Sequence, residues 1–275
     1  MLKINNNDFD TLVVMLTARD LDIILDQIDA IFWSCLSKIK IVIVDDTKKI
    51  KDLNIENVEV VYTNTKIKNK YNHNMAQKVN AGILHAINKN YNFKMAMVID
   101  DDALPINSKG LDLWALNILK YNENIGCIGS KDEAIYSKDW MLEKIKNHFK
   151  EYFSNIENFK FPERQVFYAV NFQSKKFIDK AFQHGLLDVK HENYPFPAES
   201  FLTNCVSLMG FENFFWGLYP DNLFPPLYSS HHGRKKPLDP RNIDKNFLIH
   251  HSIKNVPNVS EKEIREYYYN QRRQA

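Results

Sequence analysis

Short apolar runs alternate with amphipathic segments over the first 130 residues of the chain. The runs have strand length, and three of them are almost continuously apolar, which is typical of strands buried on both faces. The expected strands are 12–16, 39–44, 58–62, 95–99 and 126–128. The segments between them repeat apolar residues every three or four positions, as helices do. The expected helices are 21–36, 71–90 and 108–121. This alternation predicts an α/β fold with a mostly parallel central sheet and helices on both faces.

The pattern beyond residue 130 is less regular and mixes helical, extended and aromatic segments. The expected helices are 140–153, 197–209 and 260–273, the expected strands are 166–172 and 247–253, and the expected loop is 214–228. Ser260 and Glu263 have the spacing of a capping box at the start of the last helix. Because there is no internal repeat and no low-complexity linker, we expect a single domain, 1–275, with a first half, 1–130, and a second half, 131–275.

The composition excludes several classes of protein. The 36 Lys and Arg nearly balance the 34 Asp and Glu, a net charge of +2, which excludes a dedicated nucleic-acid binder. Cys35, Cys127 and Cys205 form no CxxC pair, which argues against a disulfide framework or a zinc finger and favours a reducing compartment. No apolar run reaches the length of a membrane span and no signal peptide is recognisable, so we expect a cytoplasmic protein.

Three consecutive carboxylates, Asp100, Asp101 and Asp102, directly follow the expected strand 95–99. Ligands of open parallel sheets bind beyond the carboxyl ends of the strands. Adjacent like charges repel one another, and a hard divalent cation such as Mg²⁺, bound by carboxylates and phosphate oxygens, relieves that repulsion. If the segment is extended, Asp100 and Asp102 point the same way. The alternative is an acidic helix N-terminus, where the carboxylates favour the positive end of the helix dipole.

Two further segments before this strand have residues suited to a nucleotide. Asp45 and Asp46 end the expected strand 39–44 and can accept hydrogen bonds from a base or a ribose, or can cap a turn. A receiver domain of response regulators is disfavoured, because its acidic pair belongs to the first strand. Gly82 lies within an expected helix, where glycine costs about 1 kcal/mol relative to alanine, so a close approach to a backbone or a ligand is expected there. Lys66, Lys68 and Lys70 form a basic loop before that helix.

In this order and spacing, these features resemble the GT-A glycosyltransferases, particularly the family 2-like inverting enzymes of the nucleotide-diphospho-sugar transferase superfamily. The resemblance covers about residues 10–130 and returns in fragments to about residue 254. Segment 11–19 resembles the first strand and turn, and Asp45 lies at the position of the family's nucleoside-binding acid. Asn80-x-Gly82-xxx-Ala86 matches the end of the family's Arg-Asn-x-Gly-xxx-Ala helix, with Val79 in place of the arginine and Lys78 beside it.

The resemblance implies a GT-A, Rossmann-like fold in which the first half, 1–130, binds a nucleotide sugar and the second half, 131–275, binds the acceptor. Asp100-x-Asp102 matches the family's Asp-x-Asp motif, which holds Mn²⁺ or Mg²⁺ against the donor's diphosphate. The residues implied to bind the nucleotide sugar are Thr17, Arg19, Asp45, Lys78, Asn80, Asp100, Asp101 and Lys254.

Segment 196–202 resembles the family's Pro-x-Glu-Asp-x-x-Leu segment, whose acidic residue lies near the acceptor. Glu199 is therefore the candidate base that deprotonates the acceptor hydroxyl in an inverting reaction. Ser200 stands where the family usually has Asp, and Glu192 and Asp188 are nearby rivals. The alternative role of Glu199 is a stabilising charge at a helix N-terminus.

Segment 247–254 resembles the family's late strand, which presents a histidine as a further metal ligand. Neighbouring strand residues face opposite sides, so only one of His250 and His251 is expected to bind the ion. We favour His251, joining Asp100 and Asp102, because His-x-x-Lys then places Lys254 near the diphosphate. One remaining candidate is a basic loop with His231, His232 and Arg234, which either closes over the donor or is simply solvated. The other is the pair Trp216 and Tyr219, which either line an acceptor pocket or pack in the core.

The resemblance thus implies a metal-dependent glycosyltransferase that moves a sugar from a nucleotide diphosphate sugar, most often a UDP-sugar in the family, to a glycan or glycolipid. Two alternatives stay open: a nucleotidyltransferase or phosphatase using the same carboxylates, and a non-catalytic sugar-binding module of the same fold. Tyr267, Tyr268, Tyr269, Arg272 and Arg273 would allow the C-terminal helix a peripheral contact with an anionic membrane at its inner face, although a solvated helix is the simpler interpretation.

Overall fold

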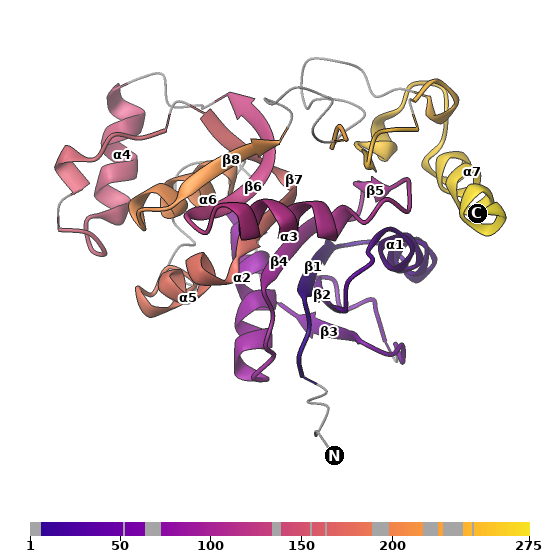
Figure 1. The fold of residues 1–275 in the computed structure, drawn as a ribbon, viewed down its shortest axis with the longest axis horizontal. Helices are drawn as coiled ribbons and strands as arrows, with labels where there is room; N and C mark the ends of the chain where they lie inside the picture. The colour runs from indigo at the N-terminus through magenta and orange to yellow at the C-terminus, as the bar shows by residue number, and fades with distance from the viewer. Residues whose placement is uncertain are drawn as a thin grey trace.

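A seven-stranded sheet in the order β3-β2-β1-β4-β7-β6-β8 forms the centre of the computed structural model (Figure 1). Its strands are β1 (Thr11–Thr17), β2 (Ile39–Asp45), β3 (Val58–Tyr62), β4 (Met95–Asp100), β6 (Ile125–Glu133), β7 (Arg164–Ser174) and β8 (Glu212–Trp216). Two short strands, β5 (Leu104–Pro105) and β9 (Ile249–His250), form a separate ladder. The structure describes residues 7–51, 53–63, 73–133, 139–154, 156–162, 164–188, 198–216, 225–227, 239–243 and 245–275.

Four neighbouring strands, β3, β2, β1 and β4, pair in parallel, and β8 is parallel to β6. The prediction of an α/β fold with a mostly parallel sheet is therefore confirmed. Strand β7 is antiparallel to both of its neighbours, β4 and β6, which the sequence pattern did not predict. Since β7 comes from the second half of the chain and pairs with β4, strands from both halves share one sheet.

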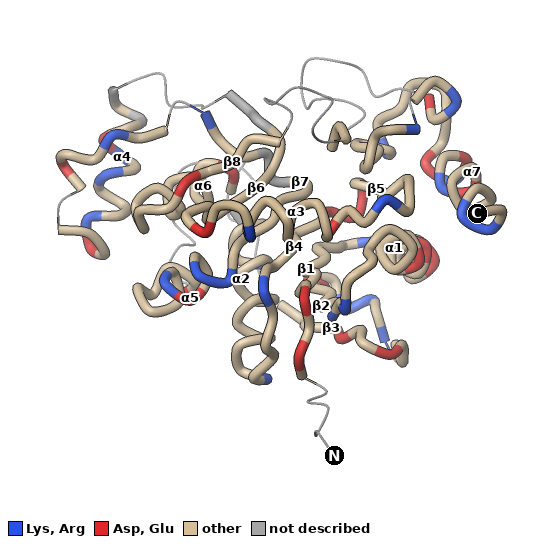
Figure 2. The backbone as a smooth tube through the Cα atoms, viewed as in Figure 1, with Lys and Arg blue, Asp and Glu red and all other residues tan. Residues whose placement is uncertain are grey.

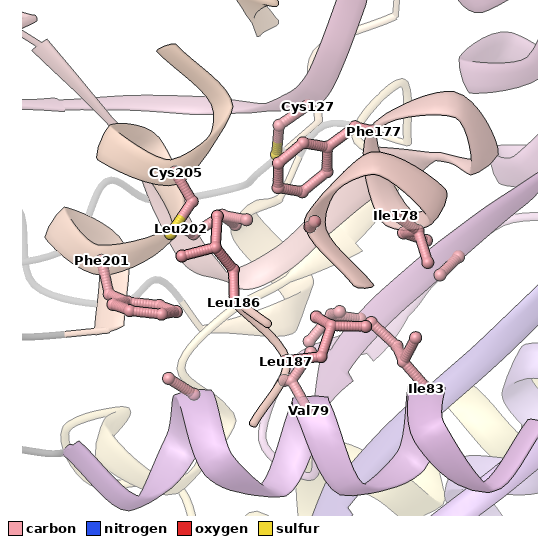
Figure 3. Packing of buried hydrophobic residues seen from close by; sticks show 14 of the residues in the cluster. Val79, Ile83, Cys127, Phe177, Ile178, Leu186, Leu187, Phe201, Leu202 and Cys205 are labelled. Atoms are coloured by element: carbon pink, nitrogen blue, oxygen red, sulfur yellow. The ribbon is translucent and has the colours of Figure 1, made fainter. Parts of the chain in front are cut away.

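Helices cover both faces of this sheet, as predicted. The helices are α1 (Leu21–Ser34), α2 (His73–Asn88), α3 (Leu111–Tyr121), α4 (Asp139–Phe149), α5 (Lys175–Gln183), α6 (Ala198–Leu208) and α7 (Glu261–Gln274). Alternate residues of β1 point to opposite faces, Val14 into the core beneath α2, α5 and α6, and Val13 into the core beneath α1 and α3. Figure 3 shows Val79 of α2 with Phe177 of α5 and Phe201 of α6 in the first of these cores.

Gly82 lies where α2 passes close to the side chains of the sheet. A Cβ atom added at this position would be 2.6 Å from Val14 Cγ1 and 3.0 Å from Val44 Cγ2. The close approach expected for this glycine is therefore an approach of the helix to the side chains of β1 and β2. Without a side chain, Gly82 lets α2 lie closer to the strands than any other residue would.

We expect Gly82→Ala to lower the free energy of unfolding by about 1–3 kcal/mol, the usual cost of overpacking a core. This loss exceeds the gain of up to about 1 kcal/mol that alanine brings to a helix interior. Denaturant unfolding measures the difference, with Asn88→Ala at the exposed end of the same helix as the control. An unfolding free energy equal to or above that of the wild type would show that the space between Gly82 and the side chains of Val14 and Val44 accommodates a methyl group.

Several element boundaries differ from the predictions. The expected loop 214–228 begins inside β8, and the expected strand 247–253 is reduced to the two residues of β9 followed by a 3₁₀ turn at Ile253–Asn255. Strand β9 pairs only with the two residues of β5, and beyond Pro105 a single further bond follows, from the Ile106 amide to the Leu248 carbonyl at 3.0 Å. Helix α5 was not predicted. The capping box of α7 is confirmed: Ser260 Oγ accepts from the Glu263 amide, and the Glu263 carboxylate accepts from the Ser260 amide.

All three cysteines are buried and free, so they form no disulfide. Burial raises the pKa of the Cys35, Cys127 and Cys205 thiols, which keeps them protonated and unreactive at neutral pH. Across the described part of the chain, no helix combines the length and the apolar character needed to span a bilayer.

Candidate active site

The carboxyl ends of β1, β2 and β4 lie side by side at one edge of the sheet. The parallel register pairs Thr17 with Asp45 and Leu16 with Asp100. The turn after β1, the acidic end of β2 and the acidic end of β4 are therefore adjacent, although about 80 residues separate the first from the last in sequence. This edge is where an open parallel sheet binds its ligands.

Residues 100–102, which we call the acidic turn, reverse the chain immediately after β4. The Ala103 amide donates to the Asp100 carbonyl at 3.2 Å, and β5 follows directly. The segment is therefore not extended, which was the condition for Asp100 and Asp102 to point the same way, because the backbone turns after the end of the strand. The alternative of a helix cap is also wrong, because the next helix, α3, begins at Leu111. Asp102 is buried within the turn, whereas Asp100 is partly exposed.

The pairing of β5 with β9 brings the segment after β9 onto the acidic turn, because it places Leu104 opposite His250. The Asp102 carboxylate accepts from the Ser252 hydroxyl and lies 2.8 Å from Lys254 Nζ and 3.4 Å from His251 Nε2. Burial alone would raise the pKa of Asp102, but the contacts with His251, Lys254 and Ser252 outweigh it and hold that pKa well below its usual range. Asp102 is therefore an anion in the folded protein.

The two histidines of this segment face different partners. His251 lies beside Asp102 and is almost completely buried. His250 Nδ1 lies 3.2 Å from the hydroxyl of Tyr268 in α7. Of the two, the structure brings His251 to the acidic turn, which is the arrangement that the sequence pattern favoured.

Negative charge is concentrated around the other two residues of the acidic turn. Burial raises the pKa of Asp100 well above its usual value, and the charges of Asp102, Asp101 and Glu199 raise it further, against the opposing effect of Lys254. Burial and Asp102 likewise raise the pKa of Asp101. Glu199, in the first turn of α6, is thus close enough to act electrostatically on Asp100. A cation among these carboxylates would relieve their repulsion.

The loop after β1 contacts the acidic turn through its backbone. The Ala18 amide lies 3.4 Å from Asp101 Oδ2, and the buried Thr17 hydroxyl accepts from the Arg19 amide at 3.1 Å. The Arg19 guanidinium pairs with Glu261 of α7. The loop therefore joins the acidic turn to the C-terminal helix.

At the end of β2, the two aspartates have different roles. The buried carboxylate of Asp45 accepts from the amide and hydroxyl of Thr47, at 2.7 and 2.6 Å, and from the Ile50 amide at 3.1 Å, so it caps its own turn. Asp46 pairs with Lys78 at 2.6 Å, and Asp46 Oδ1 is buried with no hydrogen-bond partner among the described residues. The sequence pattern singled out Asp45 for the nucleoside, whereas in the structure Asp45 caps its own turn and Asp46 is paired with Lys78.

Two other predicted binding residues lie on α2. The side chain of Lys78 reaches from α2 to the end of β2, where it forms its ion pair with Asp46. Asn80 is buried and donates to the Leu186 carbonyl at 3.4 Å, in the core between α2 and the segment after α5. The structure thus brings Lys78 to the candidate site and uses Asn80 in packing.

The donor atoms at this edge fit a divalent cation. Asp100 and Asp102 offer carboxylate oxygens and His251 offers an imidazole nitrogen, which suit Mg²⁺ and Mn²⁺. Within the described residues, no group of three or more His, Cys, Asp and Glu side chains is already arranged as a metal site. The ammonium of Lys254 is instead placed against Asp102. An ion that binds both aspartates therefore competes with Lys254 for Asp102.

Trp216 and Asp188 are the remaining candidates that the structure describes. Trp216 is buried against Phe172, and its indole N–H donates to the Pro225 carbonyl at 2.8 Å, so its role as an acceptor-pocket residue is wrong and it belongs to the core. Asp188 is exposed. The pKa of the nearby Tyr152 is raised by the burial of that tyrosine and by the charges of Glu151 and Asp188. The other predicted residues lie outside the described ones: Lys66, Lys68, Lys70, Glu192, Tyr219, His231, His232 and Arg234.

Comparison with known proteins gives similarity in structure only. No protein-family model matches the chain, and no curated protein matches its sequence. A mannosyltransferase from Pyrobaculum calidifontis, solved with GDP-Man and Mn²⁺, is similar over 76% of this chain and 55% of its own, at 14% identity and a TM-score of 0.43. A glycosyltransferase involved in glycosylation of the major capsid of PBCV-1 is similar over 95% of this chain and 99% of its own, at 11% identity and a TM-score of 0.45.

A third similar structure is the bifunctional glycosyltransferase WbbM, over 96% of this chain and 50% of its own, at 14% identity and a TM-score of 0.47. The chain therefore spans about half the length of two of these three proteins. At such identities and TM-scores the likeness does not define a function, which must be argued from the site itself.

Proposed function

We propose that the chain is a metal-dependent glycosyltransferase of the GT-A type, with a nucleotide diphosphate sugar as donor and a glycan or glycolipid as acceptor. The observation that carries the proposal is the meeting of three segments at one sheet edge. The acidic turn, the loop after β1 and the end of β2 come together there, and the β5–β9 ladder adds His251 and Lys254. These are the segments whose motifs resemble the family.

In this proposal the first half of the chain binds the donor. Asp46 and Lys78, and Asp45 through the turn that it caps, form the nucleoside end of the site. Thr17 and Arg19 shape the loop beside the diphosphate. Asn80 supports this region from the core. UDP is our first choice of nucleotide, on the family resemblance alone.

The diphosphate would lie over the acidic turn. Asp100, Asp102 and His251 would hold Mn²⁺ or Mg²⁺, which neutralises the negative charge of a leaving diphosphate. Asp101 shares the turn and is linked by its carboxylate to the Ala18 amide. Lys254, with its side chain 47% exposed, can exchange its contact with Asp102 for one with a phosphate oxygen.

Glu199 is the proposed base of an inverting reaction. It lies in the first turn of α6, from which its charge helps to raise the pKa of Asp100. From there its carboxylate would take the proton of the acceptor hydroxyl as that oxygen attacks the anomeric carbon. The second half of the chain, which contributes α6, would then supply the acceptor side of the site.

The reaction class is tested by offering the protein nucleotide sugars, nucleoside triphosphates with sugar 1-phosphates, and phosphomonoesters, each with Mn²⁺. We expect release of a nucleoside diphosphate from one nucleotide sugar, slowly to water and faster once a suitable glycan is present. Release of pyrophosphate from a triphosphate, or of phosphate from a monoester, would contradict the proposal and favour the nucleotidyltransferase or phosphatase alternative.

A further inference from the structure

The C-terminal helix α7 inserts a buried guanidinium next to the acidic turn. Arg265 is 6% exposed, and its Nη2 donates to the Asp101 carbonyl at 2.6 Å. Its Nη1 donates to Asp26 Oδ2 at 2.9 Å and to Gln27 Oε1 at 3.2 Å, and its Nε donates to Glu261 Oε1 at 3.0 Å. All three nitrogens of the guanidinium are therefore engaged, and one is committed to the backbone of the turn.

Every backbone carbonyl from residue 101 to residue 103 is held from outside the turn. Arg265 holds the carbonyl of Asp101, the Ile253 amide donates to that of Asp102 at 3.2 Å, and the Gln27 side chain donates to that of Ala103 at 2.8 Å. Gln27 is fully buried and is itself oriented by Arg265. The direction of the Asp102 carboxylate therefore depends on a backbone that Arg265 and Gln27 fix on both sides.

Arg265 is also linked to the loop after β1. Glu261 accepts from Arg265 with one carboxylate oxygen and from Arg19 with the other. Arg19 follows Ala18, whose amide lies near Asp101 Oδ2. One network thus connects α7 with two of the segments that form the candidate site.

A second arginine of α7 provides a matched comparison. Arg272 is 7% exposed and pairs with Asp26 and Asp29 of α1, so it shares a partner with Arg265. Figure 2 shows the acidic positions of α1 and the basic positions of α7 on these neighbouring helices. Both arginines dock α7 on α1. Arg265 also bonds to the acidic turn, whereas the hydrogen bonds that Arg272 makes with described residues go to α1.

We infer that Arg265 is a positioning residue: its guanidinium fixes the backbone of the acidic turn, and with it the place from which Asp100 and Asp102 can reach a divalent cation and a nucleoside diphosphate. The inference rests on the proposed function for its ligand. Preorganisation of this kind lowers the cost of ordering the ligands of an ion when it binds. Outer contacts that orient metal ligands typically contribute about 10–100-fold to metal affinity.

The test compares Arg265→Met with Arg272→Met, since both changes remove a buried guanidinium that pairs with Asp26. Thermal unfolding, amide hydrogen exchange and calorimetric binding of UDP and GDP with Mn²⁺ are measured on each variant. We expect both to lose thermal stability. Only Arg265→Met should speed exchange of the Ala103 and Ile253 amides and weaken Mn²⁺-supported nucleotide binding, by about tenfold or more.

Arg265→Lys is a milder second variant in case Arg265→Met does not fold. Lysine keeps the positive charge beside Asp26 and Glu261 but lacks the planar fork that reaches several acceptors at once, so it should show the same effects at smaller size. Equal changes in exchange and nucleotide affinity for the Arg265 and Arg272 variants would overturn the inference. If the wild type binds no nucleotide, the proposed function fails, and the exchange of the Ala103 and Ile253 amides still decides whether Arg265 holds the turn.

Discussion

Glu199→Gln is expected to lower the turnover of a nucleotide sugar with its acceptor by about 10²–10⁴-fold, the usual contribution of a positioned general base. Glutamine keeps the size of the side chain but cannot accept the proton of the acceptor hydroxyl. Binding of the donor nucleotide should change little, because we propose that its site is formed by the ends of β1, β2 and β4. The comparison of kcat with nucleotide affinity therefore isolates the chemical step.

The alternative role of Glu199, a charge at the N-terminus of α6, makes a different prediction. Loss of such a charge costs stability by about 0.3–1 kcal/mol and has no direct effect on turnover. Glu143→Gln on the exposed side of α4 serves as the control for any general effect of removing a carboxylate. If Glu199→Gln turns over like the wild type, the base assignment is wrong, and Asp188 and Glu192 become the carboxylates to test.

Asp102→Asn is expected to weaken metal-dependent nucleotide binding by at least about 10–100-fold, because changes even to residues that only orient metal ligands have effects of that size. Asparagine preserves the shape of the side chain and removes the charge. Calorimetric titration of the nucleotide at fixed Mn²⁺ measures the loss. The same titration without metal should show little difference between the two proteins.

The effect of Asp102→Asn on stability should be small by comparison, because two contributions oppose each other. Since folding lowers the pKa of Asp102, its charge stabilises the fold above its usual pKa, and that stabilisation disappears as the pH falls through the folded pKa. Since Asp102 helps to raise the pKa of Asp100, the ionised Asp100 is less costly once Asp102 is neutral. The variant should therefore remain folded, with a stability deficit at neutral pH that diminishes in acid.

Asp112→Asn is the matched control for this prediction. Asp112 is also a buried carboxylate, but it accepts from the Leu36 and Ser37 amides, both at 2.9 Å, at the far end of α1 from the acidic turn. It should cost stability and leave nucleotide binding intact. Equal losses of nucleotide affinity in the Asp102 and Asp112 variants would show that the acidic turn has no special role.

The sequence predicted the parallel part of the sheet well because burial on both faces leaves a strong signal. Strands β1, β2 and β4 are almost continuously apolar, and β1 and β2 are buried along their whole length. The direction of β7 has no such signal, because a buried apolar strand has the same sequence pattern whether its neighbours run parallel or antiparallel to it. The extent of β9 depends on its pairing with β5, whose Pro105 is 144 residues away from Ile249 in sequence and becomes its partner only in the fold.

The candidate site shows the same limit. Local patterns identified the three carboxylates of the acidic turn. The alternation of a strand predicted that only one of His250 and His251 faces the site, and the His-x-x-Lys spacing favoured His251, which is the histidine that lies beside Asp102. The sequence left open whether Asp45 binds a nucleoside or caps a turn, and its hydrogen bonds from Thr47 and Ile50 show that it caps its turn. Arg265 was not predicted at all, because its partner Asp101 lies 164 residues away.

Calorimetric titration of the wild-type protein with UDP, GDP and CMP, each with and without Mn²⁺, tests the central claim most directly. We predict that one nucleoside diphosphate binds and that its binding depends on the metal. Binding of CMP without metal would contradict the metal-dependent mechanism while leaving a transferase in place. If none of the three nucleotides binds in the presence of Mn²⁺, the assignment of this sheet edge as a nucleotide-sugar site is wrong.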